Sequence, residues 1–110
     1  MGLVKTENFT RKQNEMANIA KALGHPARIA IIEQLLKANS CICGEIVDEV
    51  QLAQPTISRH LKELKAVGII KGTIEGTSVN YCIDGKKWRV IQSLFNELFD
   101  TYVLDHDCAC

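Results

Sequence analysis

Polar and cationic side chains gather along one segment of the sequence, residues 52–68. Its apolar residues Ile57, Leu61 and Leu64 recur at the spacing of a helix with one buried face. The other positions carry hydroxyl, amide, imidazole and cationic groups, which bind base edges and phosphates in a major groove. A solvated helix face has a similar composition, so the prediction of a DNA-binding helix depends on the neighbouring elements. The predicted DNA contacts are Gln54, Thr56, Ser58, Arg59, His60 and Lys62.

Two Cys-x-Cys pairs, Cys41 with Cys43 and Cys108 with Cys110, form a second group of reactive side chains. Thiolates two residues apart can reach one ion where the backbone is extended or where a helix begins. Thiolates bind soft ions such as As(III), Cd(II), Pb(II) and Zn(II). We therefore hypothesise that Cys41 and Cys43 bind a metal or metalloid, and that Cys108 or Cys110 folds back to complete the site. The alternative is a tail whose thiols bind nothing.

The distribution of charge favours DNA as a partner, although the net charge of the 110 residues is zero. Residues 51–90 contain seven Lys and Arg against three Asp and Glu, which gives a local net charge of +4. Residues 91–110 have a net charge of −4. Because the local field steers binding, the positive segment agrees with the predicted DNA contacts.

The compartment predicted from the sequence is the cytoplasm. No apolar run approaches the length of a membrane span, and the N-terminus has no signal-peptide core. The five cysteines are then expected to be thiols rather than structural disulfides. Cys82, alone on its strand, is expected to be a packing residue.

The elements around the DNA-binding helix predict a helix-turn-helix followed by a hairpin, or wing. Pro26 suits the first turn of a helix, and His25 beside it is expected to form structural hydrogen bonds. Gly68 has the position of a glycine that ends a helix, and Lys71 of the wing is expected near the flanking phosphates. The expected helices cover about 9–23, 26–37, 43–50, 52–67 and 86–104, with the helix-turn-helix over about 43–67, the wing over about 69–83 and a tail over 105–110. The apolar residues expected to face inward from the second helix are Ile29, Ile32, Leu35 and Leu36.

The last expected helix is unusually apolar for the end of a small domain, which favours a subunit interface. We expect it to pair with its symmetry mate, alongside the helix over about 9–23, in a twofold homodimer. Two DNA-binding helices about 34 Å apart could then contact a palindromic site. The expected fold is mainly α with a small β-hairpin, a single winged helix-turn-helix domain over residues 1–110. The apolar stripe of the last helix consists of Trp88, Ile91, Phe95, Leu98, Phe99 and Tyr102.

Several stretches of the sequence together resemble one family of regulators. They are Ala22-Leu-Gly-His-Pro-Ala-Arg-Ile-Ala-Ile-Ile32, Cys41-Ile-Cys43, Gln54-Pro-Thr-Ile-Ser-Arg-His-Leu-Lys62 and the wing after Gly68. The combination resembles the ArsR/SmtB family of metal- and metalloid-responsive repressors. The resemblance implies a homodimer with its first and fifth helices at the interface, which binds operator DNA until an inducer releases it. The DNA-reading positions that it implies are Gln54, Thr56, Ser58, Arg59 and His60.

Three positions depart from the pattern of that family. Many members have Ser or Thr where Ala53 stands, so we expect a helix cap weaker by about 1 kcal/mol at most. The thiolate site of the family usually lies where Cys41 and Cys43 stand, but Ile46 replaces a third cysteine. A second family site uses carboxylates and histidines on the last helix, where Lys86 would repel a cation. The carboxylates of that stretch are Asp84, Glu97 and Asp100.

Proteins of other classes share some of these features. A thiol-redox or persulfide-responsive repressor would use the same DNA-binding helix and the same cysteines. A metal carrier with a winged-helix body would use the cysteines alone. An enzyme is not expected, because the sequence contains no clustered acid–base pair, no Gly-rich phosphate loop and no Cys–His arrangement with an orienting group. No permanent cofactor is expected, and the inducer would be As(III) or a soft divalent ion.

Overall fold

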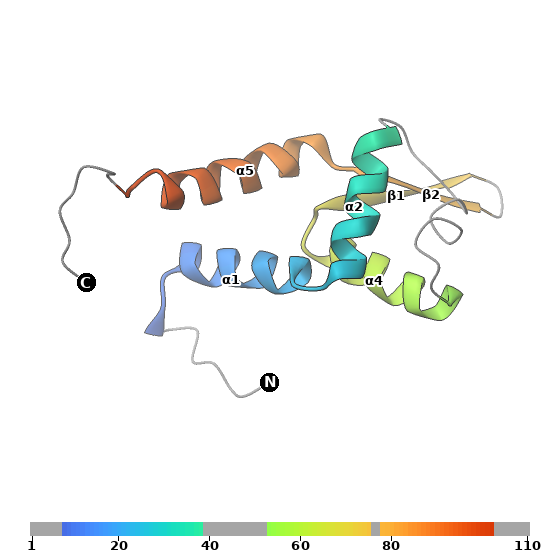
Figure 1. Ribbon diagram of the computed structural model, residues 1–110, viewed down its shortest axis with the longest axis horizontal. Coiled ribbons are helices and arrows are strands. Elements are labelled where there is room, and N and C mark those ends of the chain that lie inside the picture. Colours follow the sequence, from blue (N-terminus) through green and yellow to red (C-terminus); the bar gives the residue numbers. More distant parts are fainter. Residues whose placement is uncertain (1–7, 39–52, 76–77, 103–110) are drawn as a thin grey trace.

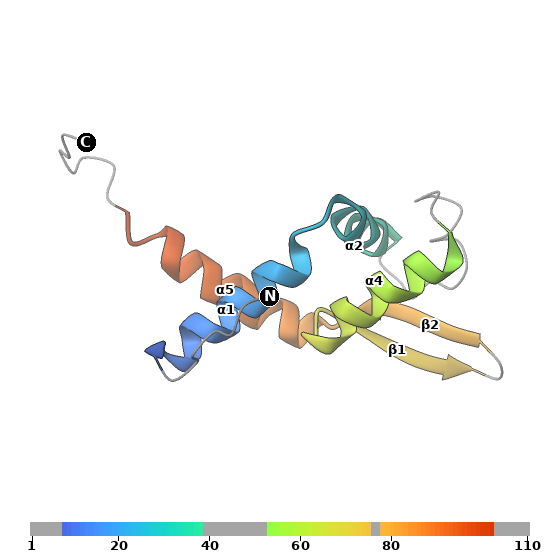
Figure 2. The same cartoon turned by 90° about the horizontal axis from the view of Figure 1, so that it is seen from below.

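The computed structural model describes residues 8–38, 53–75 and 78–102. Figure 1 shows α1 and α5 side by side at one end of the molecule, while α2, α4 and the hairpin lie at the other. Figure 2 shows α4 running beside the hairpin. The predicted helix over about 43–50 lies outside the described residues. The elements are α1 (Arg11–Leu23), α2 (Pro26–Ala38), α4 (Gln54–Ala66), β1 (Ile70–Glu75), β2 (Ser78–Ile83) and α5 (Gly85–Phe99).

The first two helices begin at residues suited to capping. Thr10 and Gln13 form a reciprocal capping box at the start of α1, in which each side chain accepts a hydrogen bond from the backbone N–H of the other residue. Pro26 is the first residue of α2, where its missing N–H has no cost. The backbone N–H of Ala27 donates to Nδ1 of His25 over 3.0 Å. This bond confirms the expected structural role of His25.

The end of α4 is fixed by a glycine. The N–H of Gly68 donates to the carbonyl of Lys65, and the N–H of Ile69 donates to the carbonyl of Leu64. This pair of bonds is a Schellman motif, which requires a left-handed residue after the helix cap. Gly68 has a φ of 85°. The predicted role of Gly68 is therefore confirmed.

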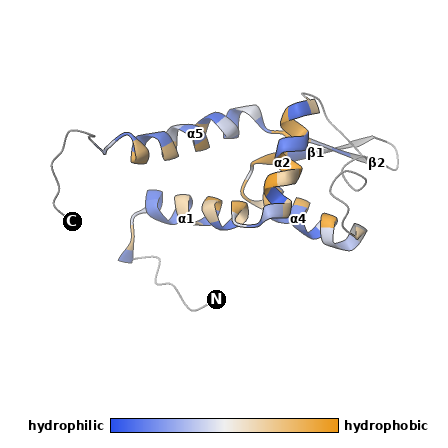
Figure 3. Ribbon diagram, in the orientation of Figure 1, coloured by the Kyte–Doolittle hydropathy of each residue, from blue (hydrophilic) through white to orange (hydrophobic). Residues whose placement is uncertain are grey.

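The hydrophobic core lies where α1, α2, α4 and the hairpin meet, and Figure 3 shows α2 as the most hydrophobic of the helices. Ile57, Leu61 and Leu64 of α4 are buried in this core, as predicted from their spacing. Among the described residues, no helix is long and apolar enough to cross a membrane. The buried hydrophobic residues are Ile19, Ala22, Ile31, Ile32, Leu35, Ile57, Leu61, Leu64, Ile69, Ile70 and Ile91.

Two sequence-based expectations about the helices are corrected. Ile32 and Leu35 of α2 are buried as expected, but Ile29 is 41% exposed and Leu36 is 46% exposed, while Ile31 is fully buried. Because α2 is apolar on more than one side, periodicity alone does not determine which side packs against α4 and β2. The last helix ends at Phe99 rather than near residue 104, with Asp100 as its C-terminal cap.

The wing is an antiparallel hairpin. Ile70 pairs with Ile83 and Lys71 pairs with Cys82. The strands agree closely with the predicted wing over about 69–83. Because directly opposite residues of a hairpin share a face, Lys71 and Cys82 lie on the face opposite to Ile70.

Candidate nucleic-acid interface

The α4 helix exposes polar and cationic side chains opposite its buried apolar residues. Ser58, Arg59 and Lys62 are exposed, and Thr56 is half-buried. Gln54 is the first residue of the helix, and its side chain is not described. Lys71 on β1 is also exposed, and Figure 2 shows β1 beside α4. These side chains are therefore available to a ligand as long and as anionic as DNA.

The start of α4 lacks a side-chain cap. Ala53 is the N-cap residue and forms no side-chain hydrogen bond, as its methyl group requires. Asp84 at the start of α5 shows the contrast, since its carboxylate accepts from the backbone N–H of Lys87 over 3.3 Å. The predicted weakness of the α4 cap is confirmed in the hydrogen-bonding pattern.

The prediction that His60 lies on the DNA-facing side of α4 is wrong. His60 is 5% exposed, and among the described residues it is the one polar residue that is buried. Nε of Arg28, on α2, donates a hydrogen bond of 2.9 Å to Nδ1 of His60. The physical reason is the helical repeat: His60 follows Ile57 by three residues and precedes Leu64 by four, so it projects toward the same interior. The bond from Arg28 satisfies Nδ1 of this ring, which lowers the cost of burying the histidine.

Arg28 is a residue to which the sequence reasoning gave no role. Its guanidinium also donates to the carbonyl of Ala22, in the last turn of α1, over 3.3 Å. It therefore connects α1, α2 and α4. An arginine in the first turn of an apolar helix, together with a histidine at an apolar position of another helix, is the sequence signal that could have revealed this pairing.

The four predicted thiolate ligands, Cys41, Cys43, Cys108 and Cys110, lie outside the described residues. Within the described part of the chain, no group of three or more His, Cys, Asp or Glu is placed to hold a metal ion. Cys82 is disulfide-bonded, so the expectation that the cysteines are thiols rather than disulfides is wrong for this residue. It is the one cysteine among the described residues.

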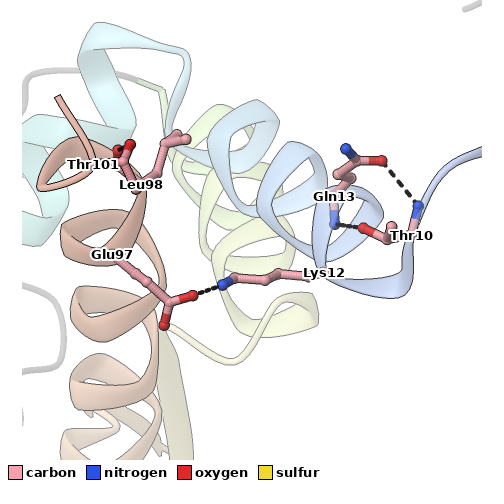
Figure 4. A network of polar contacts seen from close by, with 6 residues as sticks. All are labelled: Thr10, Lys12, Gln13, Glu97, Leu98 and Thr101. Atoms are coloured by element: carbon pink, nitrogen blue, oxygen red, sulfur yellow. Dashed lines mark hydrogen bonds and ion pairs between the residues drawn. The ribbon is translucent and has the colours of Figure 1, made fainter.

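Two of the three carboxylates of the second family site, Asp84 and Glu97, have other partners in this chain. Asp84 caps α5, as described above. Glu97 of α5 forms an ion pair with Lys12 of α1 (Figure 4), and Glu15 of α1 pairs with Lys87 of α5 over 3.2 Å. These contacts join α1 to α5 within one chain.

Comparisons with known proteins identify the family. A family model described as bacterial regulatory protein, arsR family, matches residues 25–71. An uncharacterized HTH-type transcriptional regulator from Methanocaldococcus jannaschii is 42% identical over 88 residues, which cover 79% of this chain and 98% of the relative. The chain belongs to the ArsR family of transcriptional regulators.

A second relative and one solved structure are also similar to this chain. The HTH-type transcriptional repressor SmtB of Mycobacterium tuberculosis is 43% identical over 63 residues, which cover 57% of this chain and 46% of that protein. The chain thus spans about half the length of SmtB. The homodimeric winged helix-turn-helix domain of a possible ArsR-family regulator from Mycobacterium bovis superposes with a TM-score of 0.63 at 24% identity, covering 96% of this chain and 98% of that domain. The fold of this ArsR-family chain is a winged helix-turn-helix, with β1 and β2 as its wing.

Proposed function

We propose that this protein is a homodimeric transcriptional repressor that binds operator DNA through α4 and the wing. The observation that carries this proposal is the orientation of α4: Ser58, Arg59 and Lys62 are exposed while Ile57, Leu61 and Leu64 are buried. Exposed hydroxyl and cationic groups on one helix face are suited to phosphates and base edges in a major groove. Lys71 of the wing would contact a neighbouring phosphate. The names of relatives such as SmtB support repression as the outcome of binding.

Dimerisation is supported by apolar side chains left exposed at the outer ends of α1 and α5. Leu98 is 54%, Phe99 is 68% and Tyr102 is 65% exposed, and Phe9, just before α1, is 51% exposed. Figure 3 shows hydrophobic residues continuing to the C-terminal end of α5. A clustered apolar surface of this kind marks a protein interface. The Mycobacterium bovis domain, which has the same fold, is homodimeric.

The inducer that we propose is a thiophilic metal or metalloid, with As(III) as the leading candidate and Cd(II), Pb(II) and Zn(II) as the others. The support is chemical: Cys41, Cys43, Cys108 and Cys110 supply two Cys-x-Cys pairs, and thiolates select soft ions. An ion that binds the DNA-free conformation more tightly would shift the equilibrium away from the operator complex. A coupling of about 1–3 kcal/mol, or about 5–150-fold in affinity, is typical of such linkage. We propose that the protein has no catalytic activity and no permanent cofactor, and that it acts in the cytoplasm.

The test is fluorescence anisotropy of the reduced protein on DNA from its own promoter, titrated with As(III), Cd(II), Pb(II) and Zn(II). Release near one ion per site, lost in the Cys41→Ser/Cys43→Ser double variant, supports the proposed inducer site. The matched Cys108→Ser/Cys110→Ser variant tests the tail, because an unchanged response would remove it from the site. Tight promoter binding that no ion affects would overturn the metal response and leave the repressor in place.

A redox-responsive repressor is the second candidate, and one observation favours it. Cys82 is disulfide-bonded, and it stands directly across the hairpin from Lys71. Oxidation of two thiols to a disulfide transfers two electrons and two protons to an oxidant such as hydrogen peroxide. If this is the switch, peroxide changes promoter affinity, dithiothreitol restores it, and Cys82→Ser abolishes the response. The metal-responsive repressor instead predicts that Cys82→Ser responds to ions as the wild type does.

A further inference from the structure

Figure 1 shows the end of α1, the start of α2 and α4 meeting at one place. The buried His60 of α4 contacts two residues there, the half-buried Arg28 of α2 and the exposed His25 that precedes α2. The rings of His25 and His60 have centroids 4.6 Å apart. Arg28 bonds to His60 on one side and to the carbonyl of Ala22 on the other. This cluster contributes nothing to the exposed face of α4, yet it connects that helix to the rest of the domain.

The contact between Arg28 and His60 requires a neutral imidazole. Because Nε of Arg28 donates, Nδ1 of His60 must accept and cannot carry a proton. A proton on Nδ1 would remove the acceptor and would place two cations within 2.9 Å of each other. His25 uses its own Nδ1 to accept from the N–H of Ala27, so it cannot offer that nitrogen to a charged neighbour.

The surroundings of His60 disfavour its charged form. Desolvation by burial lowers the pKa of His60, and the nearby charges of His25, Arg28 and Arg59 lower it further. The elements packed against α4 also carry charged groups. Lys21 of α1 and Arg28 of α2 line a neighbouring hollow together with Glu63 of α4 itself. Lys71 of β1 is exposed. No carboxylate is among the groups that act on His60 within the described part of the chain. Among the described residues, therefore, no carboxylate would neutralise the buried positive charge of a protonated His60.

His60 is adjacent in sequence to Arg59, the exposed cation at the centre of the proposed DNA-binding face. A rotation or displacement of α4 around His60 would move Ser58, Arg59 and Lys62 together. We propose that the Arg28–His60 pair is a proton-sensitive positioning contact, which holds α4 in its DNA-binding orientation and releases it when His60 is protonated. This inference rests on the proposed function, because it concerns the same DNA-binding face.

The first test is the pH profile of promoter affinity, measured by anisotropy between pH 7.5 and 5.5 for the wild type and for His60→Asn. Asparagine offers an oxygen near the position of Nδ1, and it does not titrate in this range. The wild type is expected to lose affinity for the promoter at low pH, by up to about tenfold per subunit if DNA lowers the pKa of His60 by one unit. His60→Asn should have a much flatter profile, although it retains the other two histidines. Identical profiles for the two proteins would overturn the inference.

An unrelated DNA duplex of the same length separates this effect from general electrostatics. Added positive charge at low pH should strengthen binding to any DNA, so a loss confined to the promoter is the expected signature. Equal weakening on both duplexes would contradict a positioning role for His60.

A second measurement needs no variant. Histidine nitrogen NMR on the wild-type protein reports the tautomer and the titration of His60, free and bound to promoter DNA. We expect the Nε2–H tautomer and a lower pKa in the complex, because linkage requires that a proton which opposes DNA binding is itself opposed by DNA. An Nδ1–H tautomer, or a pKa unaffected by DNA, would overturn the inference. Failure of the wild type to bind the promoter at pH 7.5 would instead remove the proposed function.

Discussion

The side chain of Lys87 lies directly over the backbone of Gly68, where α4 gives way to the wing. A Cβ atom on Gly68 would be 3.1 Å from Cγ of Lys87. The same lysine reaches Glu15 of α1, with 3.2 Å between Nζ and Oε2. One side chain of α5 thus covers the end of α4 and pairs with α1, which ties the proposed DNA-binding helix to the proposed dimer helices.

Replacing Gly68 by alanine should destabilise the protein. The residue has a φ of 85°, a conformation that costs an L-residue about 1–2 kcal/mol, and its new methyl group would displace Lys87. Urea unfolding of Gly68→Ala should therefore show a loss of at least about 1 kcal/mol. Gly85→Ala is the control, because a Cβ at Gly85 meets nothing within 4 Å. Equal stability of the Gly68 variant and the wild type would contradict the assigned helix ending.

Adding a hydroxyl at the start of α4 should stabilise it. Ala53 already has the extended backbone of an N-cap, with φ −62° and ψ 145°. Ala53→Ser should raise the free energy of unfolding by about 1 kcal/mol. The reverse change, Asp84→Ala at the start of α5, should lower it by about 0.5–2 kcal/mol. Denaturant midpoints measure both changes. If Asp84→Ala left the free energy of unfolding unchanged, the cap of α5 would contribute little.

The stability of the fold should decrease as the pH falls below the ordinary pKa of histidine, about 6.5. The folded state lowers the pKa of His60, so it binds this proton less readily than the unfolded chain does. The contribution of His60 to stability is then fully present above that pH and is lost as the pH falls through the folded-state pKa. Thermal melts between pH 7.5 and 5 should show this loss in the wild type and a smaller one in His60→Asn. A melting temperature that rises on acidification would contradict the assignment.

A charge on the apolar end of α5 should disrupt the dimer. Phe99 is 68% exposed in the single chain, so Phe99→Glu should leave the fold intact while weakening self-association. Leu36→Glu is the matched control, because Leu36 is also exposed, by 46%, but lies on α2 rather than on a proposed dimer helix. Sedimentation equilibrium distinguishes the two variants. Dissociation by Leu36→Glu alone would move the interface to α2.

Among the elements that the structure describes, the sequence predicts the helices and the wing well, because their signals are local. Pro26 marks the start of α2, Gly68 marks the end of α4, and the spacing of Ile57, Leu61 and Leu64 marks the buried face of α4. The buried side of α2 could not be predicted, because Ile29 and Ile31 are equally apolar and tertiary packing decides between them.

The sequence predicts the candidate site less completely than the fold. The errors in that prediction concern contacts between residues that are far apart in the sequence. His60 has a polar side chain, which favours an exposed position in a sequence-based prediction. Its buried ring is hydrogen-bonded by Arg28, which is 32 residues away in the chain. Local periodicity likewise does not reveal that Cys82 is disulfide-bonded. The thiolate ligands remain a prediction, since they lie outside the described residues.

The central claim, that the exposed face of α4 binds specific DNA, is tested most directly by comparing Arg59→Ala with Arg89→Ala on promoter DNA. Both residues are exposed arginines on helices, but Arg89 lies on α5 and bonds to Gln92. Anisotropy titrations over a range of salt concentrations should show that Arg59→Ala loses about 1–3 kcal/mol of promoter affinity, or reduces the salt slope by about one. Arg89→Ala should match the wild type. Equal loss in both variants, or no preference of the wild type for its promoter over unrelated DNA, would contradict the account.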